Sequence, residues 1–191
     1  MQQPFRPTRE QIAAARGKTV PDVISHGLRV LFCGINPGLY TAAVGHHFAR
    51  PGNRFWPAIH QAGFTPRQLT PFEEEELLNY GYGVANIVGQ ATARADELSA
   101  EELTRGGDAL VAKIQIFKPR FCAILGLGAY RVAFRQPKAS PGLKSEKLGG
   151  ISSAWVLPNP SGLNANYQME DLVRMLKELK AAVDKECAPQ R

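Results

Sequence analysis

The sequence predicts an α/β fold in which a four-stranded parallel sheet is covered by helices on both faces. The chain has 191 residues with 44% hydrophobic content, which suits one compact domain with a substantial core. Four short apolar runs, each followed by Gly, Pro or Asn, read as buried strands. Helical segments separate these runs, and strands that alternate with helices are typical of a parallel sheet with both faces covered.

The first twenty residues form a separate segment of the predicted organisation. Prolines open it, and Thr8 with Gln11 matches a capping box for a short helix that ends near Gly17. We therefore expect a peripheral N-terminal arm over residues 1–20. A single domain over residues 21–187 and a short tail over 188–191 complete the predicted organisation.

The strands and helices follow from local patterns along the rest of the chain. Strands are predicted at residues 28–33, 83–88, 121–125 and 154–157, and helices at 54–61, 73–79, 100–117, 128–134 and 168–185. Ser99 and Glu102 supply a capping box for the longest middle helix. The last helix carries one apolar stripe, formed by Met169, Leu172, Leu176, Leu179 and Val183. Residues 136–150 hold two prolines, three glycines and three lysines, which predicts an exposed loop.

Charge and cysteine usage narrow the possible partners. Lys and Arg number 23 against 17 Asp and Glu, and the resulting net charge of +6 favours a polyanionic partner. Cys33, Cys122 and Cys187 are far apart and lack metal-ligand spacing, so we expect reduced thiols and neither metal nor other cofactor. No apolar run approaches the ~20 residues of a membrane span. The expectation is a cytoplasmic protein that does not associate with membranes.

Two loops carry an unusual combination of residues. Residues 34–39 read GINPGL after the first strand, and residues 158–164 read PNPSGLN after the fourth. Ligands of open α/β sheets bind outside the carboxyl ends of the strands, where these loops lie. Asn, Pro and Gly together make a stiff turn whose backbone can approach a ligand. Turn chemistry alone favours ordinary turns, because Asn, Pro and Gly are the commonest turn residues.

The chain resembles the mismatch-specific uracil and thymine DNA glycosylases of the uracil-DNA glycosylase superfamily. The resemblance runs from about residue 23 to 180 and includes GINPGL at 34–39, PGNRFW at 51–56, GYGVANIV at 81–88 and LPNPSGLN at 157–164. It implies a three-layer α/β/α sandwich with a four-stranded parallel sheet. The implied partner is double-stranded DNA with a G·U or related mismatch, from which the base is flipped and hydrolysed away.

The same resemblance implies roles for the first loop and the residues after it. Asn36 would hold the attacking water near C1′, and the backbone of Ile35 and Gly38 would border the pocket. Phe48 would stack on the flipped base, with an ordinary core phenylalanine as the alternative. Thr41 would lie near the C5 edge of the base, which predicts that uracil is preferred over thymine.

Two further polar residues have open assignments. Asn86 ends the second strand and would bind the base or a phosphate, or simply cap the strand end. Asp96 is the candidate base that would activate the water held by Asn36. Its alternative is an exposed loop or helix-capping aspartate.

The second loop matches the element that enters the DNA in the family. Leu163 would be the apolar wedge, and the backbone around Gly162 and Asn164 would accept hydrogen bonds from the orphaned guanine. Asn159 and Ser161 would contact the pocket or a flanking phosphate. Several relatives have an Arg shortly after the wedge, and its absence here predicts looser discrimination of the opposite base.

Other motifs receive no catalytic role. His46 and His47 have no carboxylate spaced to orient them, so surface or phosphate contact is expected. The 126–128 GLG turn lacks a full dinucleotide fingerprint, and the helix start there can meet a phosphate. No Lys stands in place of Asn36 to form a Schiff base, so we expect a monofunctional enzyme. We also expect a monomer. The rival functions are a mononucleotide-binding or hydrolytic domain and a catalytically silent DNA-damage binder.

Overall fold

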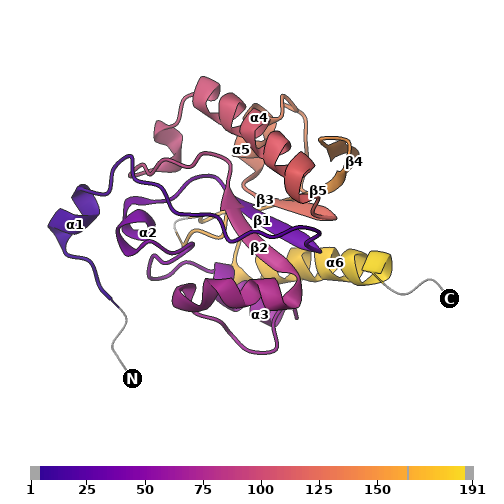
Figure 1. Ribbon diagram of the computed structural model, residues 1–191, viewed down its shortest axis with the longest axis horizontal. Helices are drawn as coiled ribbons and strands as arrows, with labels where there is room; N and C mark the ends of the chain where they lie inside the picture. Colours follow the sequence, from indigo (N-terminus) through magenta and orange to yellow (C-terminus); the bar gives the residue numbers. More distant parts are fainter. Residues whose placement is uncertain (1–4, 163, 188–191) are drawn as a thin grey trace.

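The computed structural model of the protein describes residues 5–162 and 164–187. A central sheet lies between two layers of helices, with α4 and α5 on one face and α3 and α6 on the other (Figure 1). The predicted α/β class with both sheet faces covered is therefore confirmed. The sheet itself has five strands and is mixed rather than four-stranded and parallel.

The sheet has the strand order β2-β1-β3-β5-β4. Four strands run parallel, and the fifth, β4, pairs antiparallel with β5 at one edge. Every residue of β1, β2 and β3 is buried, because helices cover both faces of these strands. The strands are β1 (Val30–Gly34), β2 (Tyr82–Asn86), β3 (Phe121–Leu125), β4 (Gly142–Leu148) and β5 (Ser152–Leu157).

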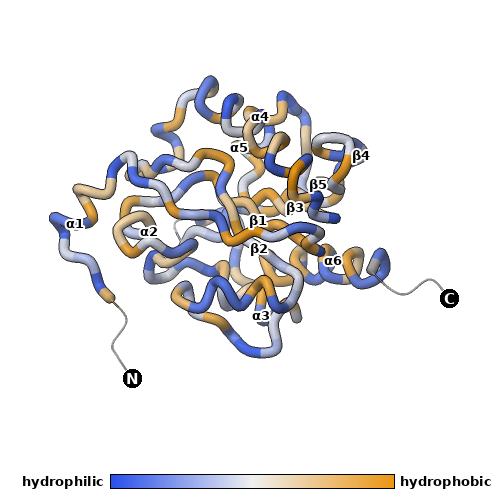
Figure 2. Tube along the Cα trace, viewed as in Figure 1, coloured by the Kyte–Doolittle hydropathy of each residue, from blue (hydrophilic) through white to orange (hydrophobic). Residues whose placement is uncertain are grey.

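The helices divide between the two faces according to which strand residues they bury. Phe32 packs with α3 and α6 in one apolar cluster, whereas Leu31 and Cys33 pack with α4 and α5 in the other, as strand alternation requires. Figure 2 shows the hydrophobic residues gathered along the central strands. The helices are α1 (Arg9–Ala13), α2 (Leu39–Val44), α3 (Phe55–Gln61), η1 (Pro71–Tyr80), η2 (Ala95–Glu97), α4 (Ala100–Phe117), α5 (Leu127–Ala133) and α6 (Met169–Cys187).

The prediction of an exposed loop over 136–150 is wrong. Residues of this segment form β4, which ends at a tight reversal where Gly149 and Gly150 have φ of +60° and +72°. The strand was missed because it lies at the sheet edge and is mostly exposed, so it has no apolar run. Charged residues such as Lys144 and Glu146 suit an edge strand, because they oppose further strand pairing.

Other elements agree with the predictions to different degrees. β3 and α4 begin and end at the predicted residues, and the Ser99 capping box is present. The segment around 73–79 is a 3₁₀ helix rather than an α-helix. A short helix, α2, follows the first loop and was not predicted, because its six residues are too few to show a period.

The arm over residues 5–20 packs on the domain. Its helix α1 begins at the predicted Thr8 capping box. Beyond that helix, Ala15 and Val20 are buried in a small cluster with Ala42 and Ala91. None of the helices in the described part of the chain has the length and apolarity needed to cross a membrane.

Candidate active site

A cleft of about 1060 Å³ opens at the carboxyl ends of the parallel strands. The loops after β1 and β5 both line it, together with residues that follow β2 and β3, as expected for an open α/β sheet. The predicted site residues on its wall are Ile35, Asn36, Gly38, Thr41, Phe48, Asn86, Asp96, Asn159, Ser161 and Asn164. Residues that lie far apart in the sequence, after β1 and after β5, thus line one cavity.

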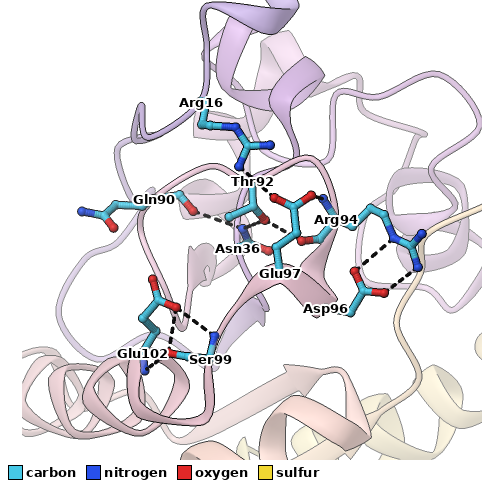
Figure 3. A network of polar contacts seen from close by, with 9 residues as sticks. All are labelled: Arg16, Asn36, Gln90, Thr92, Arg94, Asp96, Glu97, Ser99 and Glu102. Carbon is cyan, nitrogen blue, oxygen red and sulfur yellow. Dashed lines mark hydrogen bonds and ion pairs between the residues drawn. The ribbon is translucent and has the colours of Figure 1, made fainter.

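Asn36 lies at the mouth of this cleft with its side-chain amide fixed in one orientation. Its Nδ2 donates to the carbonyl of Gln90 at 3.1 Å and to the Thr92 hydroxyl at 2.8 Å. Thr92 in turn donates to the carbonyl of Arg94 at 2.7 Å (Figure 3). A backbone carbonyl can only accept, so the amide nitrogen must face Gln90. The Asn36 Oδ1 is therefore the atom left to accept from a ligand or water.

Phe48 lines the same cleft in a strained backbone conformation. Its φ is +54°, a region that bulky side chains rarely adopt. One ring face stacks on Phe55 with the centroids 4.0 Å apart, so the ring surface that lines the cleft is the remaining one. Gly34 lies next to the Phe48 ring, which a Cβ added to Gly34 would meet at 3.4 Å. This wall can accept a flat ring against an aromatic surface.

Asn86 is buried at the end of β2 and contacts a buried histidine. Its Nδ2 donates to His47 Nδ1 at 3.3 Å, while the other ring nitrogen, Nε2, donates to the carbonyl of Pro21 at 2.9 Å. The Pro21 carbonyl fixes the proton on Nε2 and leaves Nδ1 as the acceptor. Burial lowers the pKa of His47 and outweighs the nearby Glu74 carboxylate, which keeps the ring neutral. Asn86 Oδ1 then faces Gly34, where an added Cβ would lie only 2.6 Å away.

The expectation of surface or phosphate contact for the two histidines is wrong for His47, which is 1% exposed. A carboxylate does orient both residues. Glu74 accepts from the His47 backbone N–H at 2.7 Å, and its other oxygen lies 2.8 Å from His46 Nδ1. Sequence spacing could not reveal this contact, because Glu74 is 27 residues from His47 along the chain.

Asp96 lies at the rim of the cleft, in η2. Its carboxylate makes a bidentate contact with the Arg94 guanidinium, with Nε and Oδ1 3.0 Å apart (Figure 3). Both side chains are exposed, at 62% for Asp96 and 73% for Arg94. The carboxylate therefore bonds Arg94 rather than Asn36 in this arrangement.

The loop after β5 is held by a residue to which sequence analysis gave no role. Arg54 donates from Nη2 to the carbonyls of Ser161 at 2.7 Å and Asn164 at 3.1 Å, and from Nη1 to that of Tyr167 at 2.6 Å. The only sequence signal was its place in the PGNRFW stretch. The Asn164 carbonyl, expected to face a guanine, already accepts one hydrogen bond from Arg54.

The remaining predicted residues of this loop have distinct positions. Asn159 Oδ1 accepts from the Ser161 backbone N–H at 2.9 Å, which closes a tight turn. Gly162 packs on Gly52, where an added Cβ would lie 2.6 Å from a carbonyl oxygen. Leu163 lies outside the described residues.

The other first-loop residues complete the wall. Thr41 is buried on α2, and Gly38 precedes that helix. The side chain of Ile35 packs beside Gly126, at the start of the turn after β3. In residues 5–162 and 164–187, no three His, Cys, Asp or Glu side chains come together in a way that could hold a metal.

The residues of the cleft fall into two groups. The inner wall, formed by Gly34, His47, Phe48 and Asn86, is mostly buried and presents an aromatic surface with an amide oxygen beside it. The outer wall, formed by Asn36, Thr92, Arg94 and Asp96, is polar and more exposed.

Comparison with known proteins agrees with this geometry. The solution NMR structure of a protein from Methanosarcina acetivorans, described as a “putative Uracil DNA glycosylase”, is similar with a TM-score of 0.57. It is 17% identical and covers 86% of this chain and 98% of its own, so the likeness is one of fold. The model of the Uracil DNA glycosylase superfamily matches residues 21–183, which includes both walls of the cleft. The chain therefore belongs to the uracil DNA glycosylase superfamily.

Proposed function

We propose that the protein is a monofunctional DNA glycosylase that flips uracil out of mismatched double-stranded DNA, mainly opposite guanine. It hydrolyses the N-glycosidic bond and leaves an abasic site for base excision repair. Membership of the superfamily supports the broader assignment, a hydrolase that acts on N-glycosidic bonds of DNA. The observation that carries the proposal is that one cleft contains both the oriented Asn36 amide and the buried Asn86 amide beside Phe48.

The reaction needs a water molecule directed at C1′ of the flipped nucleotide. Asn36 Oδ1 accepts a hydrogen bond from that water, because both of its amide donors are already used. The C–N bond breaks as the sugar develops oxocarbenium character, and uracil leaves as an anion with the bonding electron pair. The water oxygen then bonds to C1′, and the proton that this water loses passes to the Asp96 carboxylate or to solvent. Asn has no useful basicity, so it orients the water rather than deprotonating it. Backbone groups of Ile35 and Gly38 border the departing base.

The inner wall explains why the base would be uracil. Asn86 Oδ1 can accept from the N3–H of uracil, whereas N3 of cytosine carries no proton. Phe48 stacks on the base, an interaction worth about 1–3 kcal/mol per base. Thr41 crowds the C5 edge, which disfavours the methyl group of thymine.

The loop after β5 would contact the duplex. Leu163 fills the space left by the flipped nucleotide, and the backbone of Gly162 and Asn164 faces the unpaired guanine. Arg54 supports this role by fixing the loop through its carbonyls. Asn159 and Ser161 contact the base pocket or a flanking phosphate. A mispaired uracil costs less to extrude, which adds selectivity for mismatches.

Asp96 is proposed as a catalytic base at the rim. To reach the water held by Asn36, its carboxylate must turn away from Arg94, with which it pairs in the free protein. Both side chains are exposed, and an exposed ion pair contributes little free energy, about 0–1 kcal/mol. Bound DNA phosphates that attract Arg94 would release the carboxylate.

We expect a single glycosylase domain over residues 21–187 that acts as a monomer in the cytoplasm, without a metal or other cofactor. The net charge of +6 supports attraction to DNA through release of counterions.

A base-release assay tests the proposed function. End-labelled duplexes with G·U, A·U and G·T pairs are incubated with the protein, treated with alkali and examined for strand breaks. We expect breaks at G·U and about a thousandfold slower release by Asn36→Ala. Asn79→Ala, a substitution of an exposed residue that does not line the cleft, is the matched control. DNA binding without base release would favour a silent damage binder, and cleavage of free mononucleotides would favour a nucleotide hydrolase.

A further inference from the structure

The N-terminal arm, residues 5–20, contacts residues 90–92, the segment whose oxygens accept hydrogen bonds from the Asn36 amide. Gly17 donates its backbone N–H to the carbonyl of Ala91 at 2.9 Å, and Ala91 donates its own N–H to the carbonyl of Lys18 at 2.9 Å. Ala91 lies between the two residues whose oxygens accept from the Asn36 amide. The arm therefore holds both the N–H and the carbonyl of Ala91, the residue at the centre of the segment that supports Asn36.

Side chains reinforce the same contact. Ala15 is fully buried and Val20 is 5% exposed, and both pack against Ala42 of α2 and Ala91. This small cluster is separate from the two large cores that cover the sheet. Its apolar contacts thus join the arm to the outer wall without involving the rest of the core.

An ion pair also connects the arm to Glu97, at the far end of the segment formed by residues 90–97. Arg16 Nη1 lies 2.8 Å from Glu97 Oε2, and the other Glu97 oxygen accepts from the Arg94 backbone N–H at 3.1 Å (Figure 3). The Arg94 carbonyl accepts from Thr92, which accepts from Asn36. The Arg16 guanidinium lowers the pKa of the Glu97 carboxyl, so Glu97 stays charged at neutral pH.

We infer that the arm is a positioning element that holds residues 90–97 and thereby keeps Asn36 Oδ1 aimed at the water. This inference rests on the proposed glycosylase function and adds residues outside the cleft to its machinery. Arg16, Glu97 and Ala15 are positioning residues, since they act through Thr92 and Asn36 rather than touching the substrate. The arm then sets the rate of hydrolysis and leaves the affinity for flipped uracil unchanged.

The test uses point variants of the full-length chain. Ala15→Glu places a charge in the buried cluster and undocks the arm, whereas Arg16→Ala and Glu97→Gln remove only the ion pair. Arg9→Ala on the same arm removes an equal charge from an exposed residue and is the matched control. Single-turnover release of uracil from a G·U duplex measures hydrolysis. Binding to the same duplex with 2′-fluorodeoxyuridine, which resists cleavage, measures affinity.

We expect Ala15→Glu to slow release about thirtyfold, because small misplacements of a reacting group reduce rates strongly. Arg16→Ala and Glu97→Gln lose about two- to fivefold, as suits an exposed ion pair. Arg9→Ala keeps the wild-type rate, and all four variants bind the uncleavable duplex as the wild type does. In an Asn36→Ala background, Arg16→Ala causes no further loss, because the amide that it positions is absent.

Several outcomes would overturn the inference. Wild-type release by folded Ala15→Glu does so, as does an equal loss of binding and release, which would indicate a general structural role. If Ala15→Glu does not fold, the two ion-pair variants decide, and wild-type rates in both overturn the inference. A wild-type chain that binds G·U duplex but releases no uracil refutes the proposed function instead.

Discussion

On the inner wall of the cleft, Asn86 and His47 are 9% and 1% exposed, whereas on the outer wall Arg94 and Asp96 have side chains 73% and 62% exposed. Core strands and stacked rings hold the inner wall in place. A hydrogen-bonded loop and the N-terminal arm hold the outer wall. We propose that shape and hydrogen-bond polarity at the inner wall set which base fits, while the outer wall sets how fast it is removed.

On the inner wall, a large effect is expected from adding a methyl group. In Gly34→Ala, the Cβ would lie 2.6 Å from Asn86 Oδ1, and the His47 contact prevents the amide from moving away. We expect uracil release to fall about a hundredfold. Gly89→Ala, where a Cβ makes only an ordinary contact with Thr19, is the control. Equal rates for both variants in single-turnover assays would mean that the inner wall does not hold the base.

On the outer wall, Asp96→Asn tests the proposed base. We expect about tenfold slower release of uracil, which is less than the roughly hundredfold or more of typical general-base catalysis, because water attack on an oxocarbenium-like sugar needs little deprotonation. Weaker leaving groups such as thymine should lose more. Glu101→Gln, which removes an exposed charge on α4, is the control. Unchanged cleavage of both bases by Asp96→Asn would remove Asp96 from the mechanism.

Thr41, which also lines the cleft, offers a smaller and more selective change. Thr41→Ala removes the branched side chain that we propose to lie near the C5 edge of the base, and we expect thymine release from G·T to rise about threefold with uracil release little changed. The G·T to G·U rate ratio is the measurement. A wild-type enzyme with equal rates on the two duplexes would already contradict the role given to Thr41.

The buried histidine predicts a difference in the pH dependence of stability. Burial lowers the pKa of His47 from its ordinary value of 6.5, so below about pH 6.5 the unfolded chain binds a proton that the folded chain does not. Stability should therefore fall as the pH falls through 6.5 towards the lowered pKa. Between pH 7 and 5.5, we expect the Tm of the wild type to drop about 2–4 °C more than that of His47→Gln. Parallel Tm curves would show that His47 does not titrate this way.

Sequence patterns predicted the buried parts of the fold well. β3 and α4 have the predicted bounds because apolar runs and a capping box mark them clearly. The edge strand β4 and the short helix α2 were missed, since neither has a long apolar pattern. Exposure at a sheet edge removes the periodicity on which such predictions depend.

Sequence motifs predicted which residues line the cleft, but not the hydrogen bonds that hold these residues in place. Motif residues such as Asn36, Phe48 and Asn86 do line one cleft. The residues that orient them were missed, because Thr92, His47 and Arg54 act through contacts that span 39 to 113 residues of sequence. Hydrogen bonds of this kind leave no local spacing to read, so only the folded chain reveals them.

We propose that the inner wall binds the base and the outer wall promotes hydrolysis. The most direct test compares binding and hydrolysis in Asn36→Ala and Asn86→Ala. The measurement is affinity for a G·U duplex with 2′-fluorodeoxyuridine beside single-turnover release from the ordinary duplex. We predict that Asn36→Ala binds as tightly as the wild type while its release falls about a thousandfold, and that Asn86→Ala loses binding and release together. Rapid release by Asn36→Ala, or unchanged binding by Asn86→Ala, would contradict this account of the cleft.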